Sequence, residues 1–125
     1  MSRIKLLIVF CYLTLHVNSC EYIANYQLVG VWRVNEIFEN DKILKDKTLA
    51  AIMLQFTDEG HYTYQGTLNY REAGTFKISS NKLFLFNQSK EEKEIHIESL
   101  NSKRLVLLME DAGKIRRMIF NKTYN

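Results

Sequence analysis

The chain has 125 residues, of which 46% are hydrophobic and 25% are charged, and it contains no proline. This length suits one globular domain, and the apolar fraction is sufficient for a hydrophobic core. Part of the formal net charge of +3 comes from a basic leader, so the charge does not point to a nucleic-acid partner.

Residues 1–19 have the pattern of a secretory signal peptide. Arg3 and Lys5 give a positive start, residues 6–15 carry no charge, and a more polar stretch ends at the small residue Ser19. An apolar run of this length is too short to span a bilayer core of ~30 Å. Removing the segment reduces the 17 basic residues to 15 against 14 acidic ones, which leaves a net charge of +1. We therefore predict an exported protein of the cell envelope.

The residues before Cys20 predict a lipid anchor. Because Cys11 lies in the leader, Cys20 is the only cysteine of the mature chain, and a disulfide within that chain is excluded. The sequence Val17-Asn18-Ser19-Cys20 resembles a bacterial lipobox, whose cysteine is acylated and becomes the new N-terminus. The resemblance implies several acyl chains on Cys20, palmitate among them, and permanent anchoring in the outer membrane of a Gram-negative bacterium. Residues 20–27 would be the tether. Cleavage by an ordinary signal peptidase, which would secrete the protein with a free thiol, is the alternative.

Residues 28–125 are predicted to form one all-β domain. Short runs of alternating polarity are separated by turns rich in Gly, Asn, Asp and Ser, which is typical of a sandwich or barrel. Such short links join only antiparallel neighbours, so we expect an eight-stranded antiparallel up-and-down barrel that closes to avoid free edges. The predicted strands are 28–38, 50–57, 61–66, 73–79, 82–87, 93–99, 103–110 and 114–122.

The first predicted strand holds Trp32, the only tryptophan, whose indole needs a pocket in the core. Gly30 lies two residues earlier on the same face and would let another backbone come close. The longest connection, residues 39–49, is either a lid over the open barrel end or a plain loop. The segments 83–86 and 105–108 are apolar on both faces. This fits either partial cover by a loop or tether, or an exposed patch for a partner or the membrane.

Several of these motifs resemble a known family. The strand Leu28-Val29-Gly30-Val31-Trp32 resembles the Gly-x-Trp strand of lipocalins. Residues 54–62, followed by 74–78 and 81–83, are similar to the small lipocalin-like lipoproteins of Gram-negative bacteria. The resemblance implies a calycin-type barrel with Trp32 at its closed end and an arginine of the last strand stacked over the indole. Arg116 and Arg117 match this arginine by position.

A barrel of eight strands has room for its own interior side chains or for one small ligand. Any pocket is therefore expected to be small, apolar and near the open end. The candidate ligand-binding residues, which the alternation directs inward or toward the rim, are Leu54, Phe56, Tyr62, Tyr64, Phe76 and Leu85.

Signals of catalysis are weak, and we predict a protein that is not an enzyme and that uses no cofactor. The sequence lacks a glycine-rich phosphate loop and a serine nucleophile elbow. Glu94, His96 and Glu98 share one strand face and could ligate a metal, but such a row is more often a solvated outer face. A metal-dependent enzyme is thus the third hypothesis.

The leading hypothesis is a membrane-anchored, lipocalin-like envelope protein that binds a small hydrophobic ligand in a narrow barrel. The alternative is a protein-binding envelope module, such as a hydrolase inhibitor or a structural barrel, whose core is filled by its own side chains.

Overall fold

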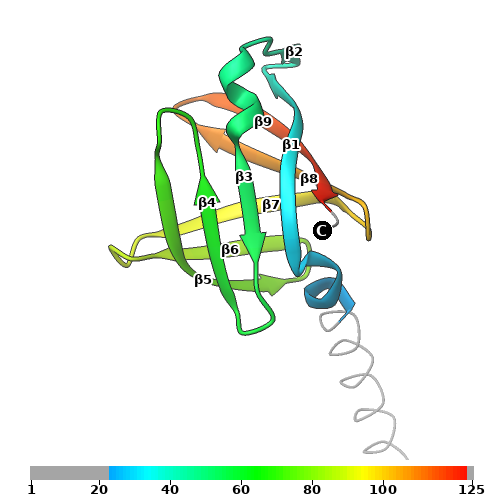
Figure 1. The fold of residues 1–125 in the computed structure, drawn as a ribbon, viewed down its shortest axis with the longest axis vertical. Helices are drawn as coiled ribbons and strands as arrows, with labels where there is room; N and C mark the ends of the chain where they lie inside the picture. The colour runs from blue at the N-terminus through cyan, green and yellow to red at the C-terminus, as the bar shows by residue number, and fades with distance from the viewer. Residues whose placement is uncertain (1–22, 124–125) are drawn as a thin grey trace, which may run out of the picture.

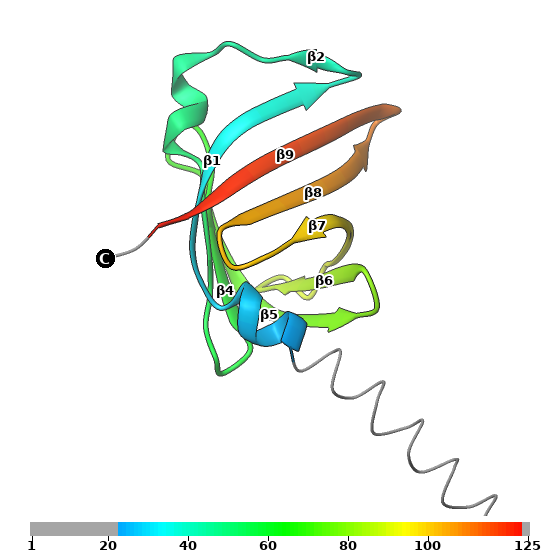
Figure 2. The same ribbon diagram turned by 90° about the vertical axis from the view of Figure 1, so that its right-hand side faces the viewer.

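The computed structural model describes residues 23–123, whose strands wrap into a barrel (Figures 1 and 2). The barrel closes because the first strand, β1 (Gly30–Glu39), pairs with both β3 (Met53–Phe56) and the last strand, β9 (Lys114–Thr123). Closure leaves neither β1 nor β9 with a long free edge. The predicted antiparallel barrel is confirmed.

The other strands follow in a meander in which every neighbouring pair is antiparallel. They are β4 (His61–Gln65), β5 (Arg71–Ser79), β6 (Lys82–Asn87), β7 (Glu92–Leu100) and β8 (Arg104–Asp111). The described sheet contains nine strands, one more than predicted. The additional strand, β2 (Lys42–Ile43), has two residues and extends β1 beyond the barrel wall.

The connection between β1 and β3 has local structure that the sequence did not predict. Asn40 and Asp41 have φ of 48° and 66°, which gives the tight turn between β1 and β2. A 3₁₀ helix (Lys47–Ala51) follows, and Asp46 caps it by accepting a hydrogen bond of 2.9 Å from the backbone N–H of Thr48. Leu44 and Leu49 pack against the core, while Ile43 is exposed. The segment therefore folds back over the barrel only in part.

One face of each strand builds a continuous core. Inward residues of neighbouring strands are in register, as in the pairs Trp32–Leu54 and Leu107–Met118. Among the described residues, those that are buried as whole residues are all apolar or aromatic. The largest fully buried ones are Trp32, Tyr62, Phe56, Phe120, Leu28, Leu83, Leu105 and Leu107.

The barrel has two different ends, which are defined here by their connections. The closed end contains residues 23–29, the start of β1 and the turns 57–60, 80–81 and 101–103. The open end contains the β1–β3 connection and the turns 66–70, 88–91 and 112–113. Residues 23–28 are helical and bring Leu28 into the core at the closed end (Figure 2).

The predicted signal peptide, residues 1–19, and the predicted acylation site, Cys20, lie outside the described residues. Part of the predicted tether, from residue 23 onward, is helical. Within residues 23–123, no helix combines the length and the apolar character needed to cross a membrane.

Candidate functional site

The closed end is built around Trp32, which is completely buried. Its indole N–H donates a hydrogen bond of 2.8 Å to the carbonyl oxygen of Leu28. The ammonium of Lys122 lies 5.2 Å from the ring centroid and donates a hydrogen bond of 3.1 Å to the carbonyl of Gln27. These contacts tie the helical segment to both the first and the last strand.

The prediction that Arg116 or Arg117 covers the indole is wrong, because Lys122 occupies that position. The reason is the register between the first and last strands. Lys122 is the cross-strand partner of Trp32, whereas Arg116 and Arg117 pair with Glu39 and Phe38 at the other end of β1.

Gly30 also has a different neighbour from the one predicted. Its φ is 137°, and a Cβ at this position would lie 2.5 Å from the Cε atom of Lys122. Gly30 therefore makes room for the lysine side chain rather than for another backbone.

The six predicted ligand-binding residues fall into two groups. Leu54, Phe56, Tyr62 and Leu85 are buried in the core. Tyr64 and Phe76 are only partly buried, and both pack against that core. Of the six, these two side chains thus have surface that a bound molecule could touch.

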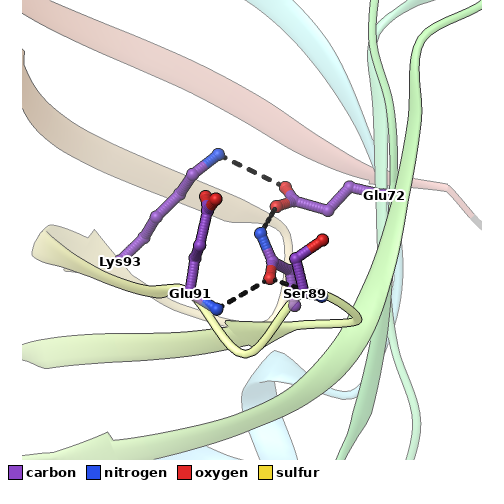
Figure 3. Close-up of polar contacts among 5 residues, drawn as sticks. Glu72, Ser89, Glu91 and Lys93 are labelled. Atoms are coloured by element: carbon purple, nitrogen blue, oxygen red, sulfur yellow. Dashed lines mark hydrogen bonds and ion pairs between the residues drawn. The ribbon is translucent and has the colours of Figure 1, made fainter.

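A polar cluster lies inside the open end (Figure 3). Glu72 is the cross-strand partner of Tyr64 and shares its inward face, and its side chain is only 7% exposed. Its carboxylate accepts a hydrogen bond of 2.9 Å from the side-chain amide of Asn87 and lies 3.4 Å from the ammonium of Lys93. The opposite charge of Lys93 offsets the cost of burying the carboxylate.

Asn87 orients this cluster. Its side-chain oxygen accepts hydrogen bonds of 3.0 Å and 2.9 Å from the backbone N–H groups of Ser89 and Glu91, so its NH₂ group points at Glu72 (Figure 3). The β6–β7 turn thereby fixes the position of the amide that holds the buried carboxylate.

Tyr62 and Tyr64 place two phenols beside this cluster. The Tyr62 hydroxyl is buried and has no hydrogen-bond partner among the described residues. Burial, helped by the negative charge of Glu72, raises the pKa of Tyr62 to about 12. Burial also raises the pKa of Tyr64, while the positive charge of Arg116 acts in the opposite direction. Arg116 and Glu72 therefore both lie within electrostatic range of the Tyr64 phenol.

The neighbouring arginines of β9 face opposite ways. Arg116 follows the inward alternation of Met118 and Phe120 and reaches the open end. Arg117 lies on the outer face, where its Nε is 2.7 Å from a carboxylate oxygen of Glu98. This hydrogen bond raises the pKa of Arg117.

The two glutamates of the possible metal-binding row, Glu94 and Glu98, form ion pairs with basic side chains of neighbouring strands. Glu94 pairs with Lys82 at 2.8 Å, Glu98 pairs with Arg117, and His96 between them is exposed. Within residues 23–123, no cluster of three or more carboxylate, histidine or cysteine side chains is arranged to hold a metal ion.

The largest described cleft, of about 670 Å³, lies at the closed end rather than at the open end where the sequence predicted a pocket. Its lining includes Tyr26, Val29, Phe76 and Lys122. A second cleft, of about 350 Å³, lies over β3, β4 and β5 near the open end and is lined mostly by residues that alternate with the inward-facing ones, namely Met53, Thr63, Gln65, Arg71 and Ala73. The first cleft is thus lined both by the segment that precedes β1 and by Phe76 of β5.

Two polar site residues could not be identified by the sequence analysis, for different reasons. Glu72 alternates with Gly74 and Phe76 and so faces inward, but the predicted strand began at residue 73 and left it in a loop. The role of Lys122 follows from the pairing of β1 with β9, and a local sequence pattern gives no information about that pairing.

A closed antiparallel barrel with a buried tryptophan at one end and polar groups inside the other defines a lipocalin-type protein. The model of the lipocalin-like domain matches residues 28–107. The chain therefore belongs to the lipocalin-like domain family. None of the curated proteins searched matches the chain.

Two solved structures share this fold. A lipocalin-like protein from Bacteroides uniformis has 15% sequence identity and a TM-score of 0.61, covering 78% of this chain and 99% of that one. An uncharacterized protein from Bacteroides eggerthii has 16% identity and a TM-score of 0.59, covering 77% of this chain and 99% of that one. A lipocalin-like barrel suggests the binding of a small ligand, and the family is generally not enzymatic.

Proposed function

We propose that this protein is a lipid-anchored, lipocalin-like protein of the bacterial cell envelope that binds a small, largely apolar ligand at the open end of its barrel. The buried hydroxyl of Tyr62, which has no hydrogen-bond partner among residues 23–123, carries the proposal. Buried polar groups in native proteins nearly always have a hydrogen-bond partner, so this hydroxyl calls for a molecule that the protein chain does not supply. The partly buried ring of Tyr64 provides adjacent apolar surface.

The sequence before the barrel supports the proposed anchor. Residues 17–20 resemble a lipobox, and the described chain enters the barrel at the closed end through the helical segment 23–28. A lipid on Cys20 would therefore hold the closed end toward the membrane and leave the open end accessible.

Ligand binding is tested with the neutral apolar dye N-phenyl-1-naphthylamine and the full chain carrying Cys20→Ala. We expect saturable binding of one dye per protein, weakened at least about fivefold by Tyr64→Ala, since the dye would lose an aromatic contact. Tyr26→Ala is the matched control because Tyr26 lines the cleft at the closed end. If only Tyr26→Ala weakened dye binding, the open-end site would be refuted. If the protein did not bind the dye at all, the proposed ligand-binding function would be refuted.

The anchor is tested by fractionating cells that express the parent chain or Cys20→Ala. We expect the parent in the membrane fraction and the variant in the soluble fraction, since the variant cannot be acylated. Equal membrane retention of both proteins would contradict acylation at Cys20.

A protein-binding envelope module with a filled core is the second candidate, and the apolar residues at the open end favour it. Leu68 is 93% exposed, and Ile43, Tyr70 and Ile115 are also exposed around the same end. Such a group of exposed apolar residues is typical of interaction surfaces. The test is chemical cross-linking in cells, with Leu68→Asp against Ile23→Asp at the opposite end. Loss of a specific cross-link with Leu68→Asp alone supports this candidate, and no difference between the variants contradicts it.

A further inference from the structure

The helical segment 23–28 has an exposed side that carries apolar residues instead of charged ones. Ala24 packs against the core and Leu28 is completely buried, and these two residues are about one helical turn apart. Ile23 and Tyr26 are 55% and 76% exposed, so they lie on the outer side. Residues 22–32 contain no charged side chain. Because a helix that faces water typically has charged or polar residues on its outer side, this face suits an apolar partner.

The cleft at the closed end adjoins this face. It is lined by Tyr26 and Val29 of the N-terminal segment, by Phe76 of β5 and by residues of the β3–β4 turn. The helical segment and this turn lie at the same end of the barrel (Figures 1 and 2). Of the described lining residues, Lys122 is cationic and Asp58 is anionic, so their formal charges cancel. The apolar side chains are therefore the feature of this end that selects a partner.

The length of backbone between Cys20 and Ile23 limits how far this face can lie from the proposed anchor. Ile23 is three residues after Cys20, and an extended backbone spans at most ~3.6 Å per residue. The Cα atoms of Cys20 and Ile23 are therefore at most about 11 Å apart, whatever conformation the backbone between them adopts. The headgroup layer of one leaflet is about 5–7 Å thick. If Cys20 is acylated, the exposed apolar face is thus within reach of the bilayer surface.

We propose that the closed end of the barrel docks on the bilayer that holds the lipid anchor, with Ile23 and Tyr26 in the interfacial layer and the cleft beside Tyr26 open to the headgroups. This inference rests on the proposed acylation of Cys20. Tyrosine suits the interfacial layer, because its ring contacts hydrocarbon while its hydroxyl stays hydrated. A docked face would fix the orientation of the barrel on the membrane, which a tether alone would not do.

Docking is tested with the parent protein, isolated from membranes and placed in phospholipid nanodiscs. Backbone amide signals are recorded by NMR with a water-soluble gadolinium chelate and, separately, with a phospholipid that carries a nitroxide near the top of its acyl chain. We expect the amides of residues 23–26 to be protected from the chelate and to lose signal with the nitroxide lipid. The amides of residues 66–70, at the open end, should respond in the opposite way.

Tyr26→Asp should restore the signal loss that the chelate causes at residues 23–26, because a carboxylate is costly to place in the interfacial layer. Leu68→Asp is the matched control, since it places the same charge at an exposed apolar position of the open end and should keep the protection. Thermal unfolding followed by Trp32 fluorescence shows that each variant is folded.

If the chelate acts on residues 23–26 as strongly as on residues 66–70, docking is overturned and the anchor is not affected. Protection from the chelate without signal loss from the nitroxide lipid would mean that a protein, such as a second copy of this chain, covers the face, and would overturn the bilayer assignment. Protection that survives Tyr26→Asp would overturn the assignment to this face. A parent protein found only in the soluble fraction would overturn the proposed anchor and this inference together.

Discussion

The Tyr62 hydroxyl lies inside the barrel, away from surface water and from any described hydrogen-bond partner. An unsatisfied buried polar group costs about 1–3 kcal/mol. We therefore expect Tyr62→Phe to raise the free energy of unfolding by about 1 kcal/mol in the absence of ligand. Urea unfolding of both proteins measures the change. A loss of stability instead would mean that the hydroxyl has a bonded partner in solution, such as a buried water molecule.

The raised pKa of Tyr62 predicts how stability depends on alkaline pH. The folded-state pKa of about 12 lies above the ordinary tyrosine pKa of 10.0, so between these values the unfolded chain loses the proton first. Stability is fully present below pH 10 and falls as the pH rises toward 12, by about 2–3 kcal/mol over two pH units. Urea midpoints measured from pH 8 to 11.5 test this decline. The stability of Tyr62→Phe should decline less steeply with rising pH. An identical decline in both proteins would show that Tyr62 does not cause it.

Alanine substitutions at Gly30 and Gly60 distinguish the cost of a steric clash from the cost of an unfavourable backbone conformation. Both have positive φ, but a Cβ on Gly30 meets the Lys122 side chain, whereas a Cβ on Gly60 meets no atom within 4 Å. Gly60→Ala should cost about 1–2 kcal/mol for the backbone conformation alone. Gly30→Ala should cost about 0.5–2 kcal/mol more, because it also displaces the flexible end of Lys122 from the face of Trp32. Chemical denaturation measures both costs, and equal values would contradict the packing of Lys122 over the indole.

At the scale of elements, the seam between β1 and β9 is extended by the turn after β1. The backbone N–H of Asn40 donates to the carbonyl of Ile115 at 2.9 Å, and the Asn40 side-chain oxygen accepts from the backbone N–H of Ile115 at 3.0 Å. Asn40 also has φ of 48°, a conformation that asparagine tolerates better than most residues. This turn thus joins the first hairpin to the start of the last strand.

We expect Asn40→Ala to lower the free energy of unfolding by about 1–2 kcal/mol, since it removes an acceptor and a residue suited to this turn. Hydrogen exchange of the Ile115 amide should accelerate more than exchange in the β4 strand. Ser80→Ala is the control, because Ser80 has φ of 59° in the β5–β6 turn. If both variants lost a similar free energy of unfolding, the hydrogen bond between the Asn40 side chain and Ile115 would not contribute to stability.

The elements also show which features the sequence could predict. Alternation and short turns are local, so the strands and the antiparallel order were predictable, with errors of a few residues at strand ends. The position of Lys122 over Trp32 was not predictable, because it depends on the pairing of residue 32 with residue 122. The polar cluster was not predicted because Glu72 lies near the start of β5. At that position the sequence does not distinguish the end of a loop from the beginning of a strand. The 3₁₀ helix Lys47–Ala51 lacks a buried residue and therefore has no hydrophobic periodicity to predict it.

At the scale of the whole molecule, β9 completes both the sheet and the core. It pairs with β1 and β8 and contributes the buried residues Met118, Ile119 and Phe120. We expect a chain ending at residue 113 to lack a cooperative unfolding transition, since it loses the seam and the cover of Trp32. Circular dichroism and Trp32 emission measure this loss. Adding a peptide of residues 114–123 should shift the emission toward the buried state, and cooperative unfolding without β9 would contradict this role.

The pairing of the first strand with the last also determines when the molecule can form. Closing the seam requires residues 31 and 123 to meet, so a nascent chain that has not yet released its final strand cannot complete the barrel. Such a chain lacks the seam between β1 and β9 that closes the barrel. The same connectivity that stabilises the finished barrel would thus delay its completion until residues 114–123 have been synthesised.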